Sequence, residues 1–261
     1  MTLATRTEKL EAFGRLLDIM DDLREKCPWD RKQTFESLRL LSIEEVYELA
    51  DELLKGNREG IAEEVGDVML HMVFYALLGQ EEGAFDIASI IHTECEKLIS
   101  RHPHIYGDVE VADEEEVKRN WEQLKLKEKG KTTVLGGVPR GLPALVKAYR
   151  MQEKTAQFGF EWEHVEEVFT KVEEELGELQ EAIAEKQGHE RVEEEFGDLL
   201  FSLVNYGRFL KVDPETALER TNQKFKRRFE HIESHAQKPL SDMTLAEMDE
   251  LWEEAKRLER Q

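Results

Sequence analysis

The sequence predicts an all-α protein of two tandem repeated helical-bundle domains, each with about five helices and a four-helix-type metal site. Apolar residues recur at helical spacing, as in Ile43, Val46 and Tyr47, whereas the alternation typical of strands is nowhere sustained. A pattern of acids also occurs twice, as Glu44-Glu45-x-x-Glu48 with Glu64-x-x-Asp67 and as Glu174-Glu175-x-x-Glu178 with Glu195-x-x-Asp198. Because both copies keep the same internal steps, we interpret the halves as two versions of one domain.

We expect ten helices, over 7–25, 34–55, 61–78, 86–101 and 114–129 in the first half and over 142–157, 163–187, 190–210, 214–235 and 244–259 in the second. Gly56 follows the second of these helices, as a helix-ending glycine should. Asp213-Pro214 reads as an N-cap with proline at the first helical position. Thr244-x-x-Glu247 reads as a capping box before the last helix.

The segment 130–143 separates the two halves. It is rich in glycine and proline, which do not continue a helix. A chain of 261 residues has room for one large or two small domains. We therefore expect an N-terminal domain over 1–129, a linker over 130–143 and a C-terminal domain over 144–261.

The composition predicts a soluble, cytoplasmic protein. Cys27 and Cys95 are too few for a disulfide framework or a thiolate metal site, and the first residues have no apolar signal core. The longest apolar stretch, near 68–78, is interrupted by His71 and is too short to cross a bilayer, so no membrane partner is expected. A formal charge of −22 opposes binding to a nucleic-acid polymer. Free nucleotides or metabolites are the expected ligands.

The two acidic patterns are candidate metal sites. Residues three apart share a helical face, so antiparallel packing of two consecutive helices would bring four carboxylates together. Like charges about 4 Å apart repel by roughly 4 kcal/mol at an effective dielectric constant of about 20, which calls for cations, protonation or solvent between them. Hard oxygen ligands select Mg²⁺, Mn²⁺ or Ca²⁺. The candidate ligands are Glu45, Glu48, Glu64 and Asp67 in the first half and Glu175, Glu178, Glu195 and Asp198 in the second.

A single acid pair has a simpler interpretation, because 36% of the residues are charged and most glutamate pairs on helices are solvated. Ser42-x-x-Glu45 also fits a capping box, which would give Glu45 a purely helical role. The duplication of all four acids favours a function for the set. His71 follows Asp67 by one turn, but its counterpart in the second half is Ser202, so we interpret His71 as a packing residue.

Basic residues repeat as well, with Lys97-x-x-x-Arg101 matched by Lys224-x-x-x-Arg228. This spacing places two cations on one helical face. A basic face set against carboxylates suits a polyphosphate bridged by metal, with Lys224 and Arg228 on the outer phosphates. Surface ion pairing is the alternative for these cations. Trp162 and Trp252 could stack on a base or pack in a core.

On these motifs the chain resembles the MazG-type nucleoside triphosphate pyrophosphohydrolases of the all-α pyrophosphatase superfamily. The resemblance covers nearly the whole chain and also rests on CPWD at 27–30, RHPHIYGD at 101–108 and NQKFKRRF at 222–229. It implies helical-bundle domains, usually dimerised, that use Mg²⁺ to convert a nucleoside triphosphate and water into a monophosphate and pyrophosphate. It also implies that the repeated acids are metal ligands and that Lys224, Arg228 and Trp252 contact the nucleotide.

Cleavage between the α and β phosphates requires water to attack the α phosphorus while pyrophosphate leaves. A carboxylate can take the proton of that water. Glu174 is the candidate base because it adjoins the ligand pair. Adjacent residues on a helix point about 100° apart, so another glutamate of the set could serve instead.

The halves differ in their candidate phosphate donors. Lys171 and Arg191 each lie one turn before a second-half acid, where the first half has Leu41 and Gly60. We therefore expect the second half to carry most of the catalysis, with surface ion pairing as the alternative role of the two cations. The candidate substrate-binding residues are Lys171, Arg191, Asn222, Lys224, Arg228, Trp252 and Lys256.

Other functions fit parts of the pattern. The acids do not distinguish a general enzyme of nucleotide-pool house-cleaning from one specific for dUTP, dCTP or phosphoribosyl-ATP. A non-catalytic interaction protein could use the acids to bind structural metal, although the cations beside the second set argue against it. A di-iron bundle would need Glu-x-x-His on two helices, and neither Glu64 nor Glu195 has histidine three residues later.

Overall fold

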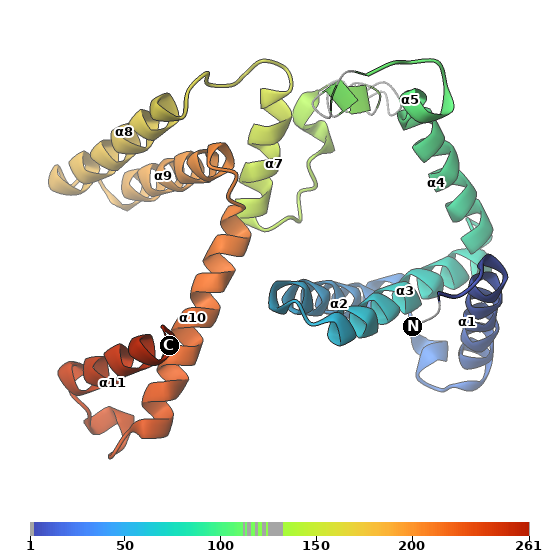
Figure 1. Ribbon diagram of the computed structural model, residues 1–261, viewed down its shortest axis with the longest axis horizontal. Coiled ribbons are helices and arrows are strands. Elements are labelled where there is room, and N and C mark those ends of the chain that lie inside the picture. The colour runs from blue at the N-terminus through green and yellow to red at the C-terminus, as the bar shows by residue number, and fades with distance from the viewer. Residues whose placement is uncertain are drawn as a thin grey trace. The chain divides into compact units, whose positions relative to one another are not determined.

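The computed structural model describes residues 3–111, 113, 116, 117, 120, 121, 124 and 133–260, and every regular element within them is helical (Figure 1). The chain divides into two compact units, Met1–Val117 and Lys118–Gln261, called here the first and second unit. Within the described ranges, no helix is long and apolar enough to cross a membrane. The predicted all-α class is confirmed.

The first unit contains α1 (Arg6–Lys26), α2 (Phe35–Lys55), α3 (Arg58–Glu81), α4 (Ile87–Arg101) and the short α5 (Pro103–Tyr106). Helices α2 and α3 pack side by side, and α1 packs on α3 (Figure 1). Buried apolar residues from α1, α2 and α3 form the core of this unit, namely Met20, Leu38, Val73, Phe74 and Leu78.

The connection between α2 and α3 sets their antiparallel pairing. The N-cap of helix α2 is Thr34, whose side chain exchanges capping hydrogen bonds with Ser37. Its C-cap is Gly56, whose φ of +68° lies in the left-handed region that favours glycine. Only Asn57 then precedes α3, so the chain must reverse at once. The reversal brings the acids of α2 opposite those of α3.

The second unit contains α7 (Ala144–Ala156), α8 (Val165–Ala184), α9 (His189–Phe209), α10 (Pro214–His235) and α11 (Leu245–Leu258). Helix α8 packs along α9, α7 contacts α9 and α10, and α11 packs on α10 (Figure 1). The short turn between α8 and α9 contains Lys186 and Gly188, both with positive φ. This turn makes α8 and α9 an antiparallel pair, as in the first unit.

Nine of the ten expected helices are present, each ending within three residues of its expected bounds. The N-cap Asp213 with Pro214 at the first position and the Thr244–Glu247 capping box are also confirmed. The helix expected over 114–129 lies largely outside the described residues, although 116, 117, 120, 121 and 124 are helical. The domain limits at 129 and 144 stay predictions. Helix α5 and the 3₁₀ turns Asp30–Lys32, Val134–Gly137 and Leu240–Asp242 are too short for apolar periodicity to reveal.

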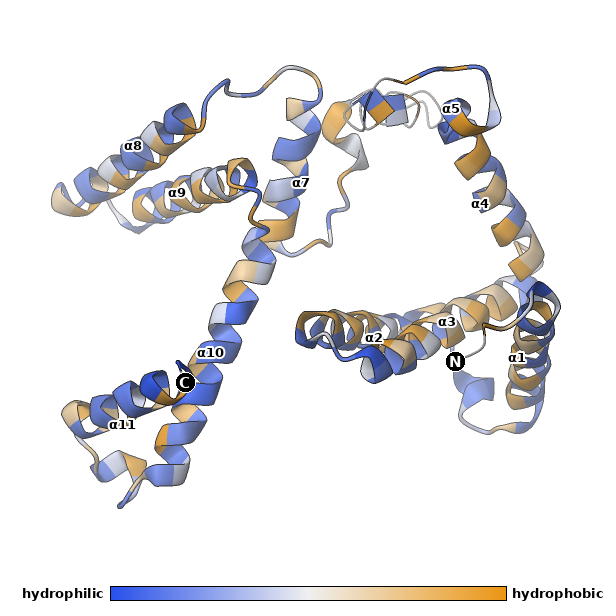
Figure 2. Cartoon of the chain, viewed as in Figure 1, coloured by the Kyte–Doolittle hydropathy of each residue, from blue (hydrophilic) through white to orange (hydrophobic). Residues whose placement is uncertain are grey.

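Both helical hairpins keep apolar side chains on their surface. Figure 2 shows hydrophobic positions along α8 and α9 as well as along α2 and α3. On the second hairpin the exposed residues include Phe169, Leu176, Phe196, Leu200 and Leu203. Two helices alone bury only the stripe that faces each other, so these residues are available to a further packing partner.

Candidate active site

Three acids of the second unit converge between α8 and α9. Glu175, Glu195 and Asp198 each place one carboxylate oxygen within 4.8 Å of the others, and we call them the second-unit acid cluster. The convergence has a local cause. Glu195 and Asp198 are one turn apart on α9, and the antiparallel return of the chain sets Glu175 of α8 against them.

Burial makes this cluster electrostatically costly. Glu195 is 1% exposed and Glu175 is 7% exposed. Burial raises the pKa of Glu195, the Arg191 guanidinium opposes that shift, and the neighbouring carboxylates add to it. Glu195 Oε2 is buried without a hydrogen-bond partner in the described part of the chain. An unpaired buried acceptor costs about 1–3 kcal/mol, so a cation or donor from a ligand would be stabilised there.

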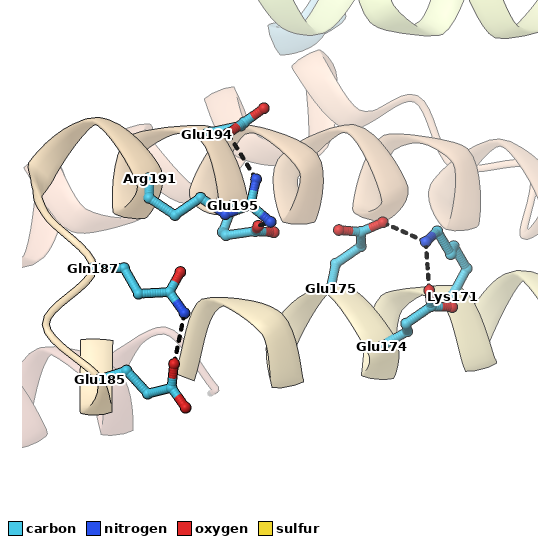
Figure 3. Close-up of polar contacts among 8 residues, drawn as sticks. All are labelled: Lys171, Glu174, Glu175, Glu185, Gln187, Arg191, Glu194 and Glu195. Carbon is cyan, nitrogen blue, oxygen red and sulfur yellow. Dashed lines mark hydrogen bonds and ion pairs between the residues drawn. The ribbon is translucent and has the colours of Figure 1, made fainter. Parts of the chain in front are cut away.

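Lys171 lies against the cluster from one turn earlier on α8 (Figure 3). Its Nζ is 2.7 Å from a carboxylate oxygen of Glu175 and 2.9 Å from one of Glu174. The hydrogen bonds to Glu175 and Glu174 raise the pKa of Lys171. The ammonium group therefore stays charged at neutral pH and is available to an anionic ligand.

Arg191 takes the matching place on α9 (Figure 3). Its guanidinium pairs with Glu195 and lies 2.7 Å from Glu194. The hydrogen bond to Glu194 raises the pKa of Arg191 most. Arg191 thus contacts one buried and one exposed carboxylate. Lys171 and Arg191, each one turn before an acid of the cluster, both place a cation beside it.

The first unit has a corresponding cluster of Glu45, Glu48 and Glu64, called the first-unit acid cluster. Glu64 Oε2 is also buried without a partner among the residues that the structure describes. Burial raises the pKa of Glu64 and of Glu45, and neighbouring carboxylates raise both further. The positions one turn before Glu45 and Glu64 are Leu41 and Gly60, which cannot donate a side-chain hydrogen bond.

Each cluster contains three of its four predicted ligands. The two predicted ligands that lie outside the clusters are Glu178 in the second unit and Asp67 in the first. They remain within electrostatic reach, since Glu178 raises the pKa of Glu195 and Asp67 raises that of Glu64. Their role as metal ligands stays a prediction.

The capping-box alternative for Ser42 and Glu45 is wrong. Ser42 lies within α2 and its hydroxyl donates to the carbonyl oxygen of Leu38 at 2.9 Å, so it caps no helix. The same hydroxyl is 2.8 Å from the Tyr75 hydroxyl and 3.0 Å from His71 Nδ1. His71 is buried among these groups, in agreement with its interpretation as a packing residue.

The remaining candidate substrate contacts lie on the α10–α11 pair. Arg228 pairs with Glu259 at 2.6 Å and lies over the Trp252 ring at 5.4 Å from its centroid. Lys256 pairs with Glu253, and Asn222 donates to Glu219 at 3.2 Å. Lys224 acts on the same carboxylate as Arg228 and helps to lower the pKa of Glu259. Among the described residues, these contacts stay within α10, α11 and the C-cap Glu259, and none of them joins the acid cluster. The role of these side chains toward substrate stays a prediction.

The donor set of each cluster fits a hard divalent cation. Three carboxylates supply the oxygen ligands that Mg²⁺, Mn²⁺ and Ca²⁺ prefer. The unpaired oxygens Glu195 Oε2 and Glu64 Oε2 are acceptors for which the described residues supply no donor. A bound cation would offset both the repulsion between carboxylates and the cost of burying them.

Comparison with known proteins settles the family. The model of the MazG nucleotide pyrophosphohydrolase domain matches the chain twice, over residues 33–106 and 163–233. The chain belongs to the MazG family. The two matches confirm the tandem repeat predicted from the duplicated acids, and they confirm the resemblance to the MazG-type enzymes. Each matched MazG segment contains one acid cluster, so the chain carries two nucleotide pyrophosphohydrolase domains of this family.

Full-length relatives support the assignment to MazG. The nucleoside triphosphate pyrophosphohydrolase/pyrophosphatase MazG of Thermotoga maritima is 45% identical over 251 residues, which is 94% of this chain and 95% of the relative. The nucleoside triphosphate pyrophosphohydrolase of Escherichia coli K12 is 39% identical over 260 residues, 96% of this chain and 99% of the relative. The crystal structure of a mazG-related protein from Thermotoga maritima is 29% identical and covers 43% of this chain and 97% of its own, with a TM-score of 0.39.

The second MazG domain also has a pocket that the sequence patterns did not reveal. The pocket has a volume of about 440 Å³ and is lined from α7, α8 and α9 and from the connection between α7 and α8. Its lining includes Glu175 and Asp198 of the acid cluster together with Gln152, Trp162 and Asn205. The spacing of residues along one helix identifies the acids, but it gives no signal for Gln152 or Asn205. These two residues lie on different helices and line the same pocket only because the helices pack together.

Proposed function

We propose that this MazG chain hydrolyses nucleoside triphosphates to monophosphates and pyrophosphate, with Mg²⁺ held by the second-unit acid cluster. The observation that carries the proposal is the position of Glu175 and Glu195, which are nearly buried carboxylates flanked by two charged side chains. A triphosphate supplies anionic oxygens for those cations and for the metal. The names of the two full-length relatives support the same reaction.

Glu175, Glu195 and Asp198 would hold the ion, and Mn²⁺ is the expected substitute. When bound, the metal neutralises phosphate charge and lowers the pKa of a coordinated water. Glu174 is exposed and adjacent to Glu175. We assign it the role of the general base, which takes the proton of the attacking water. The water oxygen bonds to the α phosphorus, the bridging bond to the β phosphate breaks, and pyrophosphate leaves.

The cations have a supporting role in this proposal. Lys171 and Arg191 remain charged and can exchange their carboxylate contacts for phosphate oxygens. Asn222, Lys224, Arg228, Trp252 and Lys256 are proposed as further nucleotide contacts. Strong negative net charge disfavours a nucleic-acid polymer as partner. We place the enzyme in the cytoplasm, where it would clear the nucleotide pool.

A pyrophosphate-release assay over the common NTPs and dNTPs tests this function. We expect release that requires Mg²⁺ and stops in EDTA. Turnover confined to dUTP, dCTP or phosphoribosyl-ATP would instead identify the protein as a pyrophosphohydrolase specific for that substrate. Absence of turnover with every nucleotide would favour the non-catalytic metal-binding protein.

We expect the chain to form a homodimer in solution. The exposed apolar residues of α8 and α9, such as Phe196, would be covered by the same face of a second copy. Light scattering at micromolar concentration should give twice the chain mass, and Phe196→Glu should lower that mass. Glu193→Gln, an exposed change on the same helix, is the matched control and should leave the mass unchanged. A monomeric mass for the fully active wild type would contradict the proposal.

A further inference from the structure

The pocket beside the second-unit acid cluster has aromatic walls. Phe160, Trp162 and Phe201 line it, and Glu175 and Asp198 border it. Phe160 is 82% exposed, and the other two rings are about half-exposed. Exposed rings next to a site for phosphates offer flat apolar faces to a planar ligand.

Gln152 adds a polar group that the protein leaves unsatisfied. The residue is 6% exposed, and its Nε2 donates to the carbonyl oxygen of Phe201 at 2.8 Å. A carbonyl oxygen is only an acceptor, so the end of the Gln152 amide that faces Phe201 must be the NH₂ group. The other end of the amide is therefore the oxygen Oε1. Gln152 Oε1 is buried and lacks a hydrogen-bond partner within the described ranges. A ligand N–H in the pocket would supply the missing donor.

A second amide in the pocket is also held in place. Arg208 pairs with Glu161 at 2.6 Å and donates to Asn205 Oδ1 at 2.8 Å. Because Oδ1 is engaged, the group that Asn205 can offer a ligand is the N–H of Nδ2. The two amides therefore offer one acceptor and one donor to a ligand between the aromatic walls. A nucleobase edge carries the complementary groups.

The first unit does not repeat this arrangement. At the spacing of 131 residues that relates Glu195 to Glu64, Asn205 corresponds to Phe74. Phe74 is fully buried in the apolar core of the first unit. The first unit thus places a core side chain where the second unit has a polar residue of the pocket lining.

We propose that the pocket binds the nucleobase of the substrate and that Gln152 Oε1 accepts a hydrogen bond from an N–H on the base edge. The inference rests on the proposed pyrophosphohydrolase function and names the recognition group of the same site. Adenine and cytosine carry an exocyclic amino group, and guanine, uracil and thymine carry a ring N–H. The site therefore accepts each common base and disfavours a base whose edge has no N–H.

Two triphosphates that differ only in this group test the role of Gln152. ATP carries the 6-amino group, and purine riboside triphosphate lacks it. We expect wild-type kcat/KM to be about tenfold higher for ATP, because the analogue leaves Gln152 Oε1 unpaired. Gln152→Leu should bring the ratio to about one. Gln157→Leu is the matched control, since Gln157 Oε1 is also buried without a partner in the described chain but does not line the pocket. It should keep the wild-type ratio.

The affinities of adenosine and purine riboside, measured in EDTA by ligand-observed NMR titration, test the pocket without hydrolysis. We expect the wild type to bind adenosine about tenfold more tightly and Gln152→Leu to lose that preference. If Gln152→Leu does not fold, Gln152→Met gives the same comparison with a side chain closer in shape. Equal affinities in the wild type, absence of binding, or a preference that survives the substitution would overturn the inference. If the wild type prefers adenosine and Gln152→Leu loses that preference, but the wild type releases no pyrophosphate from any triphosphate, the proposed function alone would be overturned.

Discussion

Replacing Glu195 by glutamine is expected to lower kcat by about a thousandfold. The amide keeps the shape of the carboxylate but removes the charge at the most buried position of the second-unit acid cluster. Calorimetry should show a matching loss of Mg²⁺ affinity. Helicity should be retained, because a neutral amide costs less to bury than a carboxylate.

Glu194→Gln is the matched control for this change. Glu194 is adjacent, exposed, and bonded to the same Arg191, but it lies outside the cluster. Its substitution should leave kcat within about threefold of the wild-type value, because surface ion pairs contribute little. A Glu195→Gln enzyme with wild-type rate and wild-type Mg²⁺ affinity would show that the metal site has been assigned to the wrong residues.

Removing two acids from the second unit is expected to abolish hydrolysis, whereas the same change in the first unit should leave the rate within about twofold. The matched pairs are Glu178→Ala with Asp198→Ala and Glu48→Ala with Asp67→Ala. Each pair removes one cluster member and one acid outside the cluster, so the two changes are equivalent in kind. The comparison is made on kcat/KM with saturating Mg²⁺.

The physical reason for this asymmetry is the surroundings of the acids. Lys171 and Arg191 contact the second-unit cluster, so a triphosphate meets cations there as well as carboxylates. At the equivalent positions the first unit has Leu41 and Gly60, and a bound metal alone would offset the repulsion. Equal loss of rate from both pairs of substitutions would refute the asymmetry.

The helices could be predicted because their signals are local. The ends of α2, α10 and α11 follow from Gly56, Pro214 and the capping box at Thr244, which act within one turn of themselves. The acid clusters were predicted because a three-residue step and a short turn leave two antiparallel helices few ways to meet. The contacts of Lys171 and Arg191 with Glu175 and Glu195 follow from the same helical geometry.

Features that depend on packing between helices could not be predicted. Spacing suggested that four acids converge, but the rotation of α8 and α9 about their axes brings only Glu175 into the second cluster from α8 and leaves Glu178 exposed. The pocket arises where α7 meets α9, and the unpaired oxygen of Gln152 exists only because Phe201 engages the other end of the amide. Such contacts leave no periodic pattern in the sequence.

Hydrolysis of a nucleoside triphosphate in ¹⁸O-labelled water with Mg²⁺, followed by mass spectrometry of the products, tests the proposed reaction most directly. Attack of water on the α phosphorus predicts the label in the monophosphate and none in the pyrophosphate, and Glu195→Gln should suppress both products together. Label in the pyrophosphate, or release of orthophosphate and a diphosphate, would contradict the proposed reaction at this acid cluster.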